Sequence, residues 1–100
     1  GVVGGEAIVA HIPALAALLS DDDPSIRGAA DGAFRTLLAA EGPGVREAAA
    51  AALGAIGPAA LPLARELAAA AAQDEDRHVR EEASRALGRS LGPQCPQFAT

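Results

Sequence analysis

The sequence lacks five residue types altogether and has few aromatic side chains. It contains no tryptophan, tyrosine, methionine, lysine or asparagine, and Phe34 and Phe98 are its only aromatic residues. Half of its 100 residues are hydrophobic, but most of these are alanine and leucine rather than bulkier side chains. One hundred residues suffice for one compact domain with a modest core. The core must therefore be built from small aliphatic side chains.

Cations are scarce too. The formal net charge is −5 because 13 acids face 8 arginines. Binding to a phosphate backbone requires clustered cations, so this balance argues against a nucleic-acid partner. It argues equally against an anionic membrane surface. A basic or neutral protein partner fits the net charge better.

Long apolar runs and paired cysteines are also missing. Arg65 and Glu66 interrupt the longest apolar stretch, which leaves it short of the roughly 20 residues that a membrane span needs. The opening "GVVGGEAIVA" lacks the basic start of a signal peptide. Cys95 stands alone, so no internal disulfide can form and a reducing, cytoplasmic location is expected. Since the chain opens without methionine, it is expected to be a fragment or a processed product of a longer protein.

What is present indicates helices. Alanine, leucine, glutamate and arginine are strong helix formers, and no segment alternates with the period of two that is typical of a strand. Turn-forming stretches recur at "DDDP", "EGPG", "GPAALP" and "QDED". These breaks predict five helices, at residues 6–20, 24–40, 44–56, 59–72 and 77–91.

Apolar residues recur at helical spacing within three of these segments. The first stripe comprises Ile26, Ala30, Ala33, Phe34 and Leu37, the second comprises Val45, Ala49, Ala52, Leu53 and Ile56, and the third comprises Val79, Ala83, Ala86, Leu87 and Leu91. The segment 44–56 carries only Arg46 and Glu47 as polar residues along "VREAAAAALGAI". A helix that is apolar nearly all round lies between neighbours, so this helix is predicted to be the most buried.

Two phrases repeat along the chain. "PSIRGAADGAF", "PGVREAAAAALG" and "RHVREEASRALG" each place an arginine after a β-branched or apolar residue and continue with alanines at helical spacing. "HIPALAALL" and "ALPLARELA" share a proline near an expected helix start, followed by leucines on one face. Two helix types joined by acidic turns indicate a solenoid, in which no single repeat can bury its own apolar face.

These phrases resemble HEAT repeats, especially the short HEAT-like repeats of phycobilisome-lyase-type proteins. The resemblance covers about residues 6–92. It implies a right-handed α-solenoid, a HEAT/armadillo-like superhelix of about five helices, with a repeat domain at 1–92 and a loose non-repeat tail at 93–100. The Val/Ile-Arg phrases are 19 residues apart from 26 to 45 but 34 apart from 45 to 79. The repeat unit therefore has either two helices or three.

The absent residue types narrow what such a solenoid binds. Armadillo proteins that carry nuclear-import signals use tryptophan and asparagine ladders, and tubulin-binding HEAT arrays use tryptophan and lysine. This chain has none of these residues. DNA-repair HEAT proteins are basic, whereas this chain is acidic. These subclasses are therefore excluded.

The acidic turns are interpreted as structural. Acids that precede a helix cap its free N–H groups and favour its positive end. In resembling proteins, Asp–Arg pairs of this kind stack between repeats as a ladder. We expect such capping and ladder pairs between Asp21, Asp22 or Asp23 and Arg27, and between Asp74 or Asp76 and Arg80.

No arrangement in the sequence indicates chemistry. The acidic turns lack the glycine and late glutamate of a calcium loop, and His11, His78 and Cys95 do not have zinc-site spacing. The serines have no His/Asp arrangement around them and no nucleophile elbow. No catalytic residue, metal or cofactor is therefore expected. The sequence favours a protein–protein interaction or scaffolding module without catalytic activity. The alternative is an accessory HEAT-like domain of a lyase or protein-modifying enzyme whose active residues lie elsewhere.

Partner-binding residues are expected on exposed helix positions outside the apolar stripes. Asp31 and Arg35 are four residues apart, so they share one helix face. Glu81, Arg85 and Arg89 have the same spacing on the last helix. Arginine is enriched at interface hot spots because its planar fork can bind a carboxylate. These five residues form the predicted partner-binding surface, with simple solvated i,i+4 pairs as the alternative.

Overall fold

The protein is described by a computed structural model that covers residues 2–91, with side chains from Val9 onward. Its elements are α1 (Val2–Ala17), η1 (Leu18–Ser20), α2 (Pro24–Leu38), α3 (Pro43–Ile56), η2 (Gly57–Leu63), α4 (Ala64–Gln73) and α5 (Arg77–Leu91), where η marks a 3₁₀-helix. No strand occurs in this part of the chain. The all-α prediction is confirmed, and the tail expected at 93–100 lies outside the described residues.

Local chemistry sets the start of two helices. The Asp23 carboxylate accepts a hydrogen bond from the Ser25 N–H (2.8 Å), and Pro24 opens α2. The Asp76 carboxylate accepts from the N–H groups of His78 and Val79, at 2.8 and 3.1 Å. These contacts satisfy N–H groups that have no partner inside the helix. The predicted capping role of the acidic turns is therefore confirmed.

The two prolines of the second repeated phrase, Pro13 and Pro62, do not mark helix starts as expected. Pro13 lies inside α1, because that helix begins at Val2 rather than at residue 6. The helix predicted at 59–72 begins with the 3₁₀ segment η2, which contains Pro62, and becomes α-helical only at Ala64. Proline has no N–H to donate and its ring crowds the preceding turn, so the α-helix α4 begins only after Pro62.

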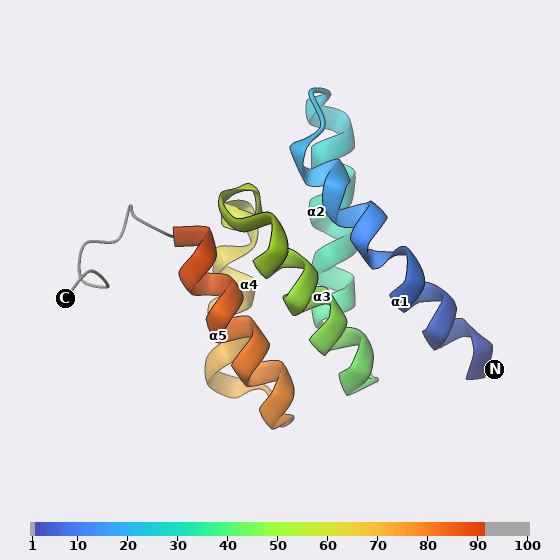
Figure 1. The fold of residues 1–100 in the computed structure, drawn as a ribbon, viewed down its shortest axis with the longest axis vertical. Helices are drawn as coiled ribbons and strands as arrows, with labels where there is room; N and C mark the ends of the chain where they lie inside the picture. The colour runs from blue at the N-terminus through green and yellow to red at the C-terminus, as the bar shows by residue number, and fades with distance from the viewer. Residues whose placement is uncertain (1, 92–100) are drawn as a thin grey trace.

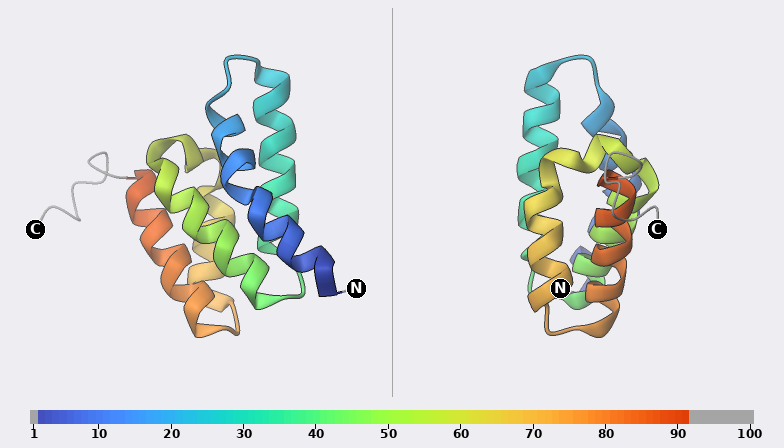
Figure 2. Two further views of the ribbon diagram at one scale, coloured as in Figure 1. Left: turned by 45° about the vertical axis from the view of Figure 1, so that its right-hand side comes forward. Right: turned by 90° about the vertical axis from the view of Figure 1, so that its left-hand side faces the viewer.

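The helices form two layers (Figure 1; Figure 2). α1, α3 and α5 lie side by side in one layer, and α2 and α4 form the other. α3 is central in its layer because it packs against both α1 and α5 and also contacts α2. Arg46, Ala49, Ala50, Leu53 and Gly54 of α3 are buried, which agrees with the prediction that this helix is the most enclosed.

The repeated phrases do not map onto these layers. α2 carries the same phrase as α3 and α5 but lies in the other layer (Figure 2). α1 and α4 share the proline phrase and are also in different layers. Successive helices reverse direction, so the turn before α2 lies at one end of the molecule and the turns before α3 and α5 lie at the other (Figure 1). The acidic turns before α2 and before α5 therefore lie at opposite ends of the molecule.

Small and medium aliphatic side chains build the core. The residues with 0% exposure include Phe34, Leu53, Leu63, Leu67 and Val79. Gly54 brings α3 and α5 close together, since a Cβ built on it would lie 3.4 Å from the Cα of Ala86. Most residues of the predicted stripes are buried or packed against the core, but Ala33, Val45 and Leu91 are only half-buried and Ile26 is exposed.

Ile26 is exposed rather than buried (37% of its surface). It lies in the first turn of α2, which extends beyond the ends of α3 and α4 (Figure 1). Its place in the core of α2 is taken by Leu38, which is buried at the other end of the helix.

One helical run is longer than the sequence suggested. α3, η2 and α4 follow each other without interruption from Pro43 to Gln73, and these 31 residues are long and apolar enough, by length and composition alone, to cross a membrane. Only 28% of the most apolar window is buried. However, the run bends at Gly57–Leu63, and α3 and α4 both pack against α5. Length and composition therefore carry no conclusion about a membrane here.

Candidate interaction groove

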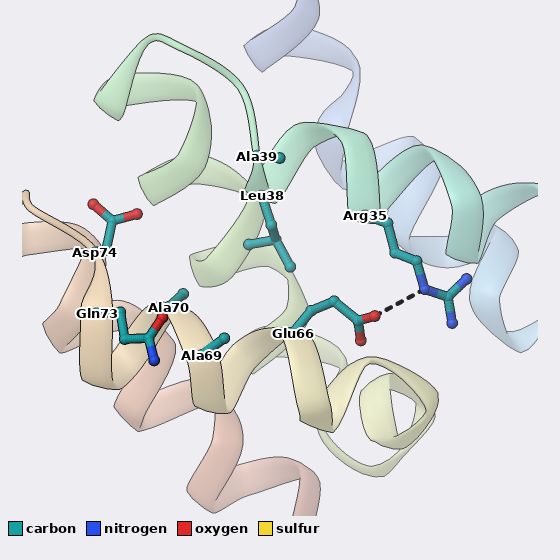
Figure 3. A pocket seen from close by; sticks show the side chains of 8 residues that line it. All are labelled: Arg35, Leu38, Ala39, Glu66, Ala69, Ala70, Gln73 and Asp74. Carbon is teal, nitrogen blue, oxygen red and sulfur yellow. Dashed lines mark hydrogen bonds and ion pairs between the residues drawn. The ribbon is translucent and has the colours of Figure 1, made fainter.

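A groove separates α2 from α4 on the two-helix layer (Figure 3). It has a volume of about 300 Å³. Aliphatic side chains and charged or amide side chains both contribute to its walls. Its lining residues are Arg35, Leu38, Ala39, Glu66, Ala69, Ala70, Gln73 and Asp74.

The groove exists because α2 and α4 barely touch each other. Each is held mainly by the other layer: α2 contacts α3, and α4 packs along α5. The facing residues Ala39, Ala69 and Ala70 are too small to fill the space between the two axes. Small side chains thus leave an opening where larger ones would make a closed core.

One ion pair crosses the groove. The Arg35 Nε donates to Glu66 Oε2 at 3.0 Å, and this is the pair drawn in Figure 3. Burial raises the pKa of Glu66. Its own backbone N–H, the hydrogen bond from Arg35 and the positive charges of Arg35 and Arg65 outweigh burial, so this pKa lies below its ordinary value. Glu66 is therefore ionised at neutral pH and holds the Arg35 guanidinium in place.

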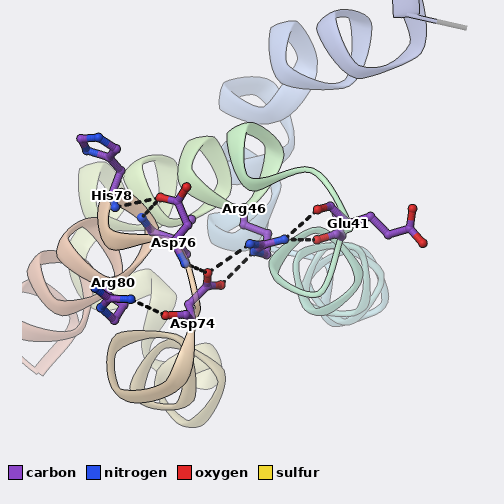
Figure 4. A network of polar contacts seen from close by, with 8 residues as sticks. Glu41, Arg46, Asp74, Asp76, His78 and Arg80 are labelled. Carbon is purple, nitrogen blue, oxygen red and sulfur yellow. Dashed lines mark hydrogen bonds and ion pairs between the residues drawn. The ribbon is translucent and has the colours of Figure 1, made fainter.

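A second and more buried ion pair closes the far end of the groove (Figure 4). Arg46 of α3 binds the Asp74 carboxylate through two hydrogen bonds, Nε to Oδ2 at 2.8 Å and Nη2 to Oδ1 at 3.1 Å. Only 10% and 8% of the two side chains are exposed. Arg46 also donates from Nη1 to the carbonyl oxygens of Ala40 and Glu41. One side chain thus joins α3 to the turn before it and to the turn before α5.

The charges of this pair support each other. Burial raises the pKa of Asp74, but the hydrogen bonds from Arg46 and from the Asp76 N–H outweigh it, with help from the charges of Arg46 and Arg80. The pKa of Asp74 therefore lies below its ordinary value. The hydrogen bond to Asp74 raises the pKa of Arg46, and desolvation opposes this only in part. Both groups are charged across the physiological pH range.

The repeated arginine has one shared function. Nη1 of Arg27 donates to the carbonyl oxygens of Asp21 (2.6 Å) and Asp22 (3.1 Å). Nη1 of Arg80 donates to the carbonyl oxygen of Asp74 at 2.7 Å (Figure 4). In all three phrases the arginine therefore reaches back to a carbonyl six residues earlier, at the end of the preceding helix or turn.

The expected carboxylate pairs are corrected accordingly. Arg27 and Arg80 bind backbone carbonyl groups of the acidic turns, not the carboxylates of Asp21, Asp23, Asp74 or Asp76. The carboxylates are occupied elsewhere: those of Asp21 and Asp74 each accept from the N–H two residues later, at 2.9 Å. A first-turn arginine reaches backward along its own chain, so the carbonyl groups that end the preceding segment are nearest to it. Of these three arginines, only Arg46 binds an aspartate carboxylate, that of Asp74 in the turn before α5.

The five predicted partner-binding residues do not form one surface. Asp31 and Arg35 are on α2, whereas Glu81, Arg85 and Arg89 are on α5 in the other layer (Figure 2). The last three are exposed. Glu81 pairs with Arg77 (3.2 Å), and Arg85 pairs with Glu82 (3.1 Å). On α5, Glu81 and Arg85 therefore form solvent-exposed ion pairs within their own helix, which was the alternative to a partner-binding role.

Of the five, Arg35 alone lines the groove. It binds Glu66 on the neighbouring helix rather than Asp31 on its own. Asp31 is half-buried, and its Oδ1 has no hydrogen-bond partner among the residues described. Sequence reasoning missed Glu66, Gln73, Asp74 and Leu38 as groove residues. Contacts between α2 and α4 depend on tertiary packing, so no local pattern marked these four.

An entirely apolar hollow of about 390 Å³ lies between α1 and α3, and its lining includes Ile12, Pro13, Ala52 and Ile56. No cluster of three or more His, Cys, Asp or Glu residues suited to a metal occurs within residues 2–91. Three of the residues that line the groove, Arg35, Glu66 and Asp74, are engaged in ion pairs.

No protein-family model, curated protein or solved structure matches the chain. The likeness to HEAT repeats therefore stands on the phrases in the sequence alone.

Proposed function

We propose that this chain is a protein–protein interaction module that receives a segment of another protein in the groove between α2 and α4. The observation that carries the proposal is the groove itself: an opening of about 300 Å³ with an apolar floor and charged ends. Concave sites with an apolar lining and a few fixed polar groups suit ligand recognition. The Arg35–Glu66 and Arg46–Asp74 pairs hold the polar groups in position before a partner arrives.

The fold we propose is a short α-solenoid of the HEAT type. Two features support it: the two-layer arrangement, and the 34-residue step from Val45 on α3 to Val79 on α5, which are neighbours in one layer. A two-helix unit accounts for this step better than a three-helix unit. Further repeats on the open side of α5 would extend the array, and a right-handed superhelix is the form we propose for it.

The proposed role is non-catalytic and cytoplasmic, without a nucleic-acid or membrane partner. It is supported by the acidic composition and by a groove whose charged groups pair with each other. The alternative is an accessory domain of a lyase or protein-modifying enzyme. The gene that surrounds this segment discriminates the two: flanking repeats alone favour a scaffold, and a flanking enzyme domain favours the alternative.

Site-specific photo-crosslinking tests the groove. A benzophenone amino acid is placed at Ala69, which lines the groove, or at its exposed neighbour Ala68, which does not. We expect a specific adduct from extracts of the source organism with the probe at Ala69 and none with it at Ala68. Equal labelling from both positions, or no adduct from a correctly folded Ala69 variant, contradicts the proposal.

A further inference from the structure

The groove continues into a second hollow at the start of α4, and its charge differs from that of the whole chain. This hollow has a volume of about 390 Å³ and is lined by Arg35, Leu61, Pro62, Arg65 and Glu66. Arg35 and Glu66 also line the main groove, so the two openings share a wall. Because two arginines and one glutamate line it, this second hollow, the mouth of the groove, is locally cationic, although the formal net charge of the chain is −5.

Both arginines have donors to spare. Arg35 uses Nε for Glu66, and its two terminal nitrogens point away from that carboxylate (Figure 3). No contact within residues 9–91 engages these two nitrogens. Arg65 likewise has neither a hydrogen bond nor an ion pair from its side chain in that range. The charges of both arginines lower the pKa of Glu66, which places both cations near one carboxylate.

An exposed apolar residue completes the hollow. Leu61 is 40% exposed, and it is one of four exposed large hydrophobic residues in the described chain. It lies in η2 beside Pro62, so its backbone is restrained by the proline ring. An incoming segment would therefore meet an apolar contact directly beside the two free cationic groups.

We propose that this hollow binds an acidic side chain of the partner, an aspartate or glutamate that is flanked by an aliphatic residue. This deepens the proposed function and rests on it. Arg35 presents its terminal nitrogens as a fork that matches a carboxylate, Arg65 adds a second cation, and Leu61 takes the aliphatic neighbour. Glu66 holds Arg35 in place and leaves one net positive charge to be neutralised.

Charge complementarity favours one carboxylate over a polyanion. Outside this mouth the chain is acidic, so a nucleic acid or an anionic membrane would meet repulsion along its length. Charges farther than about 8 Å are largely screened at physiological salt. A single carboxylate at the mouth therefore experiences mainly the two arginines and Glu66. The net charge of the whole chain predicted a basic or neutral partner. The two arginines and one glutamate of this hollow favour an acidic side chain of the partner instead.

The test uses blocked five-residue peptides titrated into ¹⁵N-labelled protein. One peptide has an aspartate between two leucines, and its matched control has asparagine at that place. We expect the aspartate peptide to shift the arginine side-chain resonances and the amide resonances of Leu61 and residues 63–66, and to bind about tenfold or more tightly than the asparagine peptide. A ratio near one overturns the proposal.

Two variants locate the contact. Arg65→Gln removes an arginine without a partner in the described chain, so the fold should stay intact while affinity for the aspartate peptide falls several-fold. Arg35→Gln should weaken binding similarly, with circular dichroism as the check on folding. Arg77→Gln, an exposed arginine on α5, is the matched control and should bind as the parent does. Undiminished binding by Arg65→Gln overturns the assignment.

Other outcomes are also decisive. If inorganic phosphate shifts the same resonances with equal or better affinity than the aspartate peptide, the hollow is a general anion site and the peptide assignment is wrong. If neither peptide binds but the Ala69 crosslink succeeds, this inference fails while the proposed function stands. If the crosslink fails as well, both fail.

Discussion

Arg46 and Asp74 are 28 residues apart in the chain and form a two-point ion pair, with distances of 2.8 and 3.1 Å. The same guanidinium binds the carbonyl oxygens of Ala40 and Glu41. Through one side chain, the turn between α2 and α3 is therefore joined to the turn between α4 and α5 (Figure 4). This contact holds one end of both layers together.

Replacing Arg46 should strongly destabilise the fold. Arg46→Ala leaves the largely buried Asp74 carboxylate without its partner, which costs about 3 kcal/mol, the lower end for a broken buried pair, because the pair lies at the end of the molecule. Arg27→Ala is the matched control: it removes the same backward bonds to carbonyl groups from an exposed arginine that has no ion pair among the described residues. Its expected cost is under about 1 kcal/mol. Urea unfolding measures both, and equal losses would contradict the role given to the ion pair.

Stability should depend on the ionisation of Asp74. Its pKa in the folded state is below its ordinary value, so the unfolded chain binds the proton more readily. The resulting stabilisation is complete above the ordinary aspartate pKa and is lost as the pH falls through the folded pKa. We expect the free-energy difference between the parent and Asp74→Asn to be largest near neutral pH and to shrink in acid. A difference that stays constant from neutral pH to pH values below the folded pKa would refute this coupling.

Leu53 should be a major core contributor. It is fully buried at the centre of α3, and Leu53→Ala should cost about 2–5 kcal/mol of unfolding free energy. Leu61→Ala removes the same atoms from a 40% exposed position and should cost much less. Thermal melting of both variants gives the comparison. An unchanged melting temperature for Leu53→Ala would be incompatible with the packing described.

Two glycines should respond in opposite directions to alanine. Gly57 ends α3 with a φ of +62°, a region that favours glycine, so Gly57→Ala should destabilise by about 1 kcal/mol or more. Gly28 lies inside α2, and a Cβ added there meets nothing within 4 Å. Gly28→Ala should stabilise by up to about 1 kcal/mol through helix propensity. Denaturant midpoints read both effects, and a shift in the same direction for the two variants would contradict this account.

Local patterns predicted the local structure. Helix formers and turn residues placed the helices near 24–40, 44–56 and 77–91 because helix propensity and capping act within a few residues. The acidic turns were correctly assigned as caps for the same reason. Helical spacing also predicted the core positions on α3 and α5. The prediction that Ile26 is buried was wrong because periodicity identifies the apolar face of a helix but not which part of that face a neighbouring helix covers.

The groove was beyond such patterns. Arg35 was chosen from its spacing to Asp31, but its partner is Glu66, which lies 31 residues away. The Arg46–Asp74 pair also left no local signal. Ala40 stands where the other two phrases have Asp21 and Asp74, but the arginines of those phrases bind the carbonyl oxygens of these aspartates and not their carboxylates.

The sequence by itself determined that the chain is helical, where its helices are capped and which arginines reach back to the preceding turn. All of these depend on atoms a few residues apart. The tertiary structure decided which layer each helix joins, which pairs of equivalent phrases lie at the same end, and where the surface is hollow. The same phrase occurs in α2 and α3, yet the reversal of chain direction between them places their first turns at opposite ends of the molecule. Alanine faces permit several close packings, so the one adopted depends on the whole set of contacts rather than on any single helix.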